Sequence, residues 1–99
     1  MPLHMVVMDH TPESCGHRSA ENAAAFGTGF QQLARGVASH GASVVGAWLN
    51  SGAHRHFLLI EAPDAHALNT ILVESGLMSH TTTTVIAVED FVSALAPPA

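Results

Sequence analysis

The stretch SVVGAWLNSGAHRHFLLIE, residues 43 to 61, contains two short apolar runs separated by a turn. The runs VVGAWL and FLLI are rich in β-branched and aromatic side chains, which favour strands. Between them, Asn50, Ser51 and Gly52 form a sequence that is typical of a tight turn. The stretch therefore predicts a β-hairpin with strands at residues 43–49 and 54–61, and the other elements are arranged around it.

A helix is predicted before this hairpin, over residues 19 to 40. Ser19 can act as its N-cap and Gly41 as its end. Apolar side chains recur there at steps of three and four, the spacing of one helical face; they are Ala23, Phe26, Phe30, Leu33 and Val37. Glycines at positions 27, 29 and 36 weaken the helix intrinsically, and we expect them to allow close approach to a sheet.

The remaining elements complete a β-α-β-β-α-β order. Pro63 can open a second helix that Gly76 ends, and the segments at 3–9 and 82–90 have the apolar, β-branched composition of strands. This order predicts an α+β, ferredoxin-like fold in which a four-stranded antiparallel sheet, of strand order 4-1-3-2, carries two helices on one face. We expect one domain at residues 1–95 and a flexible tail at 96–99.

The four strands are near-continuous apolar runs, which is typical of a sheet covered on both faces. Two helices cover one face only, and a second copy of the chain is the simplest cover for the other. The element order of the whole chain resembles the dimeric α/β-barrel superfamily, which includes muconolactone isomerase-like enzymes, small monooxygenases and small metal-binding proteins. The resemblance implies a homodimer formed through the open sheet face and a ligand pocket between sheet and helices.

Charge and composition exclude several classes of partner. The formal net charge is −5, with three arginines and no lysine, so the chain cannot build the basic face that nucleic-acid binding requires. No apolar run is long enough to span a bilayer, and we expect no membrane association. Cys15 is the single cysteine, which excludes an intrachain disulfide and suits the cytoplasm as the expected location.

Eight histidines among 99 residues are the outstanding feature of the composition. In the 4-1-3-2 order, the end of the first strand lies beside the starts of the third and fourth strands. His10, His54, His56 and His80 should therefore gather at one edge of the sheet. The loop after the first strand adds His17 and Cys15 to that edge, whereas the remaining three fall at the opposite edge: His4, His40 and His66.

This convergence predicts a transition-metal site. His54 and His56 are two residues apart on a predicted strand, so both should point to one face, and His10 can supply a third ligand. We regard His80, His17 and Cys15 as weaker candidate ligands. Imidazoles suit zinc, copper, nickel and iron, whereas a thiolate favours zinc or copper. Glu13 and Cys15 are the candidate catalytic groups.

Three functions remain open at this point. The first is a metal-dependent enzyme that acts on a small molecule, because three protein ligands leave a metal position vacant for catalysis. The second is a non-catalytic metal carrier, buffer or sensor that uses the same ligands. The third is a haem-binding, monooxygenase-like protein, for which His80 would be the axial ligand.

Overall fold

The predicted hairpin is present in the computed structural model, which describes residues 1–98. β2 (Ser43–Asn50) and β3 (Arg55–Glu61) run antiparallel. β1 (Leu3–Asp9) pairs with β3 on one side and with β4 (Thr82–Val88) on the other. Within residues 1–98 these strands form one four-stranded sheet of order β2-β3-β1-β4. The predicted α+β fold class and the 4-1-3-2 strand order are confirmed.

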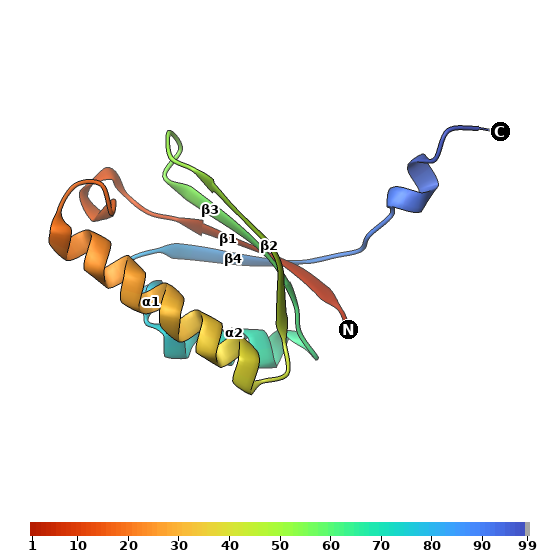
Figure 1. Cartoon of the computed structure of the whole chain (residues 1–99), viewed down its shortest axis with the longest axis horizontal. Helices are drawn as coiled ribbons and strands as arrows, with labels where there is room; N and C mark the ends of the chain where they lie inside the picture. Colours follow the sequence, from red (N-terminus) through yellow and green to blue (C-terminus); the bar gives the residue numbers. More distant parts are fainter. Residues whose placement is uncertain (99) are drawn as a thin grey trace.

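Two α-helices, α1 (Ala20–Ser39) and α2 (Ala65–Ser75), lie on the same side of the sheet (Figure 1). Each begins at a side chain that accepts a hydrogen bond from the first turn, Ser19 from the Asn22 N–H and Asp64 from the Ala67 N–H. Gly76 ends α2 in the left-handed conformation, at φ 78°. Short 3-10 helices are η1 (Pro12–Ser14), η2 (Leu77–Ser79) and η3 (Val92–Leu95).

The hydrophobic core lies between the sheet and the two helices. Alternate residues of β1 and β3 point into it, and Val6, Met8 and Ile60 are fully buried. The predicted apolar face of α1 supplies Phe26, Leu33 and Val37 to the same cluster. Because His56 lies directly opposite Met8 in the β1–β3 register, it shares this helix-covered side of the sheet.

Two α1 glycines, Gly29 and Gly36, face the neighbouring elements η2 and α2, and the expectation that they would approach the sheet is wrong. A Cβ added to Gly29 would lie 2.4 Å from Leu77 Cδ2 in η2, and one added to Gly36 would lie 3.2 Å from Ile71 Cγ2 in α2. The physical reason is that α1 packs against α2 and η2 along the edge that carries these glycines. The close approach therefore joins the two helices to each other.

Gly29→Ala is expected to destabilise the fold by about 1–3 kcal/mol, because the new methyl group overlaps the buried Leu77 side chain. Gly27 on the same helix is the matched control, since nothing lies within 4 Å of the position its Cβ would take. Gly27→Ala should stabilise the protein by about 0.5–1 kcal/mol through helix propensity alone. Urea unfolding of both variants measures the difference, and equal effects would contradict this packing.

The far side of the sheet carries neither helix (Figure 1). Its exposed apolar side chains include Trp48, 56% exposed, and Ile86, 49% exposed. β4 ends at Val88, two residues earlier than predicted, because its partner β1 begins at Leu3, opposite Val88. The chain then runs away from the sheet towards η3 (Figure 1). No helix in residues 1–98 is long and apolar enough to cross a membrane.

Candidate metal centre

The structure brings several histidines together at the edge of the sheet where β1 ends and β3 begins. The backbone N–H of His10, the residue after β1, donates a hydrogen bond to the His54 carbonyl at 3.0 Å. The His10 ring lies 5.2 Å from the His54 ring and 5.5 Å from the His56 ring, measured between centroids. Strand pairing thus joins residues that are more than forty positions apart in the sequence.

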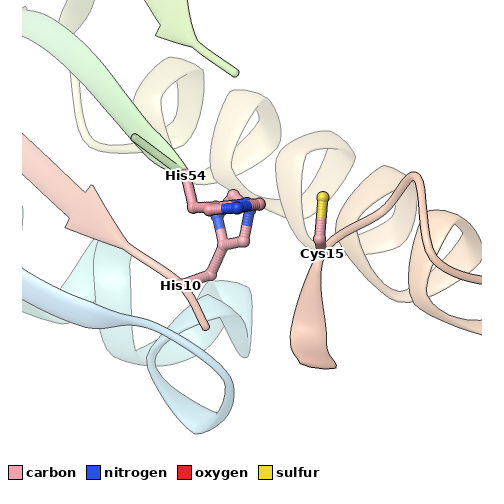
Figure 2. A group of neighbouring side chains, drawn as sticks. All are labelled: His10, Cys15 and His54. Atoms are coloured by element: carbon pink, nitrogen blue, oxygen red, sulfur yellow. The ribbon is translucent and has the colours of Figure 1, made fainter. Parts of the chain in front are cut away.

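Three side chains form the tightest group at this edge. One ligand atom each from His10, Cys15 and His54 lies within 4.8 Å of the other two. Figure 2 shows the two imidazoles next to each other and the Cys15 side chain across from them, on the loop that leads into α1. The three residues come from the end of β1, the following loop and the turn before β3.

Asn22 in the first turn of α1 anchors the cysteine loop. Its side-chain amide donates to the Glu13 carbonyl at 2.8 Å and to the Cys15 carbonyl at 3.1 Å. Within η1, the Thr11 hydroxyl accepts a hydrogen bond from the Ser14 N–H. These contacts hold the Cys15 side chain inside the protein, where the residue is 8% exposed. Sequence reasoning missed Asn22, because nothing in the sequence signals that this helix residue contacts the preceding loop.

His54 lies in the turn and not on the strand. β3 begins at Arg55, one residue later than predicted, and His54 adopts a left-handed backbone with φ 53°. A left-handed residue breaks the alternation of a strand, so the expectation that His54 and His56 point alike from one strand does not apply. His54 is part of the cluster with His10 and Cys15. The His56 ring instead lies against two α1 rings, with centroid distances of 5.7 Å to Phe26 and 5.1 Å to Phe30.

Several imidazole nitrogens at this edge are buried and, within residues 1–98, have no hydrogen-bond partner. They are both nitrogens of His10, Nδ1 of His54, Nδ1 of His56 and Nε2 of His80. Buried polar atoms are costly unless something satisfies them. A metal ion or a polar ligand would supply that partner.

Burial also decides which protonation state these rings prefer. Desolvation lowers the pKa of His10, the nearby His54 charge adds to the effect, and the Asp9 carboxylate opposes it. Desolvation lowers the pKa of His56 as well, followed by the charge of His10. Burial therefore favours the neutral form of both imidazoles, which is the form whose lone pair can bind a metal.

The weaker candidates lie around this group. His17 is exposed. His80 contacts the Phe26 ring at 5.1 Å and lines a separate, shallow cavity of about 250 Å³. Glu13 is exposed and contributes its backbone carbonyl to Asn22. The three histidines predicted for the opposite edge are outside the group: His4, His40 and His66.

Asp9 forms an ion pair with Arg55 and is not part of the three-residue cluster. In the register it lies opposite Arg55, whose Nε donates to Asp9 Oδ1 at 2.5 Å. The pair stands on the sheet side opposite the helices, because the alternate residue Met8 faces the core. A ligand set drawn from the nearest donors therefore contains two imidazoles and a thiol, and no carboxylate.

A cavity of about 100 Å³ adjoins the group. Two of the three clustered side chains, His10 and Cys15, form part of its wall. Phe26 of α1 and Leu49 of β2 are its apolar walls. His56, Gly16, His17 and Ser51 complete the lining. A molecule in this cavity would therefore contact two of the three side chains of the cluster.

Comparison with known proteins gives one family. A family model described as "Domain of unknown function (DUF3303)" matches residues 5–99. No curated protein matches the chain significantly.

Proposed function

The chain belongs to the DUF3303 family, and from its site we propose that it binds one transition-metal ion through His10, Cys15 and His54. The observation that carries this proposal is the mutual approach of the three donor atoms to within 4.8 Å. In a tetrahedral zinc site, ligand atoms at about 2.0–2.3 Å from the metal lie roughly 3.5 Å apart. The three donor atoms would have to approach one another by about one ångström more to reach the spacing of a tetrahedral site.

The donor types favour a borderline or soft metal. A thiolate beside two neutral imidazoles suits zinc or copper, and it suits iron or nickel less well. The buried, unpartnered nitrogens of His10 and His54 support the same assignment, because metal coordination would satisfy them. Zinc is the first metal to test, since it needs no redox partner.

The role that fits best is that of a metal-dependent enzyme acting on a small molecule. Three protein ligands leave the fourth tetrahedral position free for water or substrate, which is the arrangement of catalytic zinc sites. The adjoining cavity gives such a molecule a place to bind. A carrier, buffer or sensor would need the same ligands but no cavity, so the cavity favours the enzyme.

Haem binding through His80 has less support. The cavity lined by His80 measures about 250 Å³ and the cavity beside the cluster about 100 Å³. Pockets for larger organic ligands span about 300–1,000 Å³. The volumes of both cavities therefore favour a metal ion over haem.

Elemental analysis of untagged protein, loaded with zinc and then dialysed, tests the metal proposal. We expect one zinc per chain, and cobalt substitution should produce the thiolate-to-cobalt absorption band in the near ultraviolet. His66→Ala serves as control, because His66 is exposed on α2, away from the cluster. Protein that retains no stoichiometric metal would refute the proposal.

We propose in addition that the chain works as a homodimer through the open face of the sheet. Along β1 and β3 this face presents Met5, Val7, Phe57 and Leu59, all partly exposed, and its flanks present Trp48 and Ile86. Contiguous exposed apolar surface of this kind is typical of an interaction site. A second copy would cover it with the same surface.

A further inference from the structure

His56 is a half-buried histidine of this edge that the three-residue cluster does not use. Its ring lies against the Phe26 and Phe30 rings of α1, and the residue is directly opposite Leu49 of β2 in the β2–β3 register. Its Nδ1 is buried and, within residues 1–98, has no hydrogen-bond partner. A buried nitrogen without a hydrogen-bond partner destabilises the fold, so a role for His56 should supply its ring with a partner.

The cavity beside the cluster gives the His56 ring a place to meet a ligand. His56 lines it together with His10 and Cys15, so one small molecule can touch His56 and the open side of the proposed metal. Phe26 and Leu49 give the cavity apolar walls. The molecule therefore needs a polar head at the metal end and an apolar body.

Charge and size define the class of molecule further. A divalent ion bound by one thiolate and two neutral imidazoles carries a net charge of about +1, and the residues that line the cavity include no carboxylate. The head group should accordingly be an anion. An apolar cavity of about 150 Å³ holds a benzene molecule, so about 100 Å³ suits a shorter body.

We propose that this cavity binds a small, branched or short-chain carboxylate, whose head group lies on the open metal position and accepts a hydrogen bond from His56. The proposal rests on the metal site proposed above and adds the class of ligand. It assigns His56 to ligand binding, in place of the metal-ligand role that the sequence predicted for it. Leu49 and Phe26 hold the apolar body.

Isobutyrate and isobutyramide are suitable probes, because they have nearly the same shape and differ in charge. We would titrate each into cobalt-loaded protein and follow the visible cobalt spectrum and the heat of binding. Isobutyrate should shift the cobalt bands, and isobutyramide should bind at least about tenfold more weakly. Equal binding of the two, or no spectral change with isobutyrate, would overturn the proposal.

Two variants test the residues. His56→Leu keeps the apolar contacts with the α1 rings, and it should bind one cobalt per chain but weaken isobutyrate about tenfold through the lost hydrogen bond. Leu49→Trp should block the cavity and abolish measurable isobutyrate binding. Leu49 is 53% exposed on an edge strand, so this second variant should fold even if His56→Leu does not.

The metal content of each sample separates the two proposals. Wild-type protein without stoichiometric cobalt would refute the metal site itself. Wild-type protein with one cobalt, in which His56→Leu or Leu49→Trp leaves isobutyrate affinity unchanged, would refute only the ligand site. Loss of cobalt in His56→Leu would make His56 a metal ligand and would also overturn the inference.

Discussion

Cys15→Ser is expected to lower the affinity for zinc by about a hundredfold or more. Structural zinc sites with four protein ligands bind with about 10–16 kcal/mol, or roughly 3 kcal/mol per ligand. A loss of that size corresponds to about two orders of magnitude in the dissociation constant. A hydroxyl is also a much poorer zinc ligand than a thiolate at neutral pH, while its similar size leaves the buried loop intact.

Competition with a chromophoric chelator at pH 7.5 measures the affinity for zinc. The zinc-dependent rise in the thermal unfolding temperature is a second, independent measurement. Zinc at a hundred times the dissociation constant should stabilise wild-type protein by about 2.7 kcal/mol, which raises Tm by roughly 10 °C or more for a domain of this size. Cys15→Ser and His54→Ala should lose most of this rise. A full zinc response in either variant, matching that of the His66→Ala control, would contradict the proposed ligand set.

The approach of His10 to His54 could be expected from the sequence because it depends on strand order alone, whereas Cys15, on the following loop, was a weaker candidate ligand. Apolar runs, capping residues and a turn motif fix a β-α-β-β-α-β order, and antiparallel pairing then sets the end of β1 beside the start of β3. No side-chain detail enters that argument. The same reasoning explains why His4 and His66 lie outside the group.

The separate positions of His54 and His56 could not be expected, because they depend on one backbone dihedral angle. The left-handed φ of His54 removes this residue from the strand. The sequence His-Arg-His at residues 54–56 is compatible with both a strand and the end of a turn. The contacts of Asn22 with the cysteine loop were equally hidden, since they join two segments whose spacing is set only by the packing of α1. Positions governed by topology were therefore predictable, and positions governed by local geometry were not.

Phe57→Glu is expected to convert the proposed homodimer into a monomer. Phe57 stands near the middle of the open face, beside Val7 of β1 and Trp48 of β2 in the two registers. In a twofold interface the substitution places two like charges in the same apolar contact. Such a juxtaposition costs several kcal/mol, which raises the dimer dissociation constant by at least about a hundredfold.

Val73→Glu is the matched control for this charge. Val73 is 58% exposed on α2, on the side of the sheet opposite Phe57, so the same substitution there should leave the dimer intact. Analytical ultracentrifugation of wild-type protein and both variants distinguishes the outcomes, and circular dichroism confirms that each variant is folded. Because the interface would bury Trp48 as well, its fluorescence should shift to longer wavelength in Phe57→Glu only. A wild-type monomer, or a Phe57→Glu dimer as tight as wild type, would show that the open face serves another purpose.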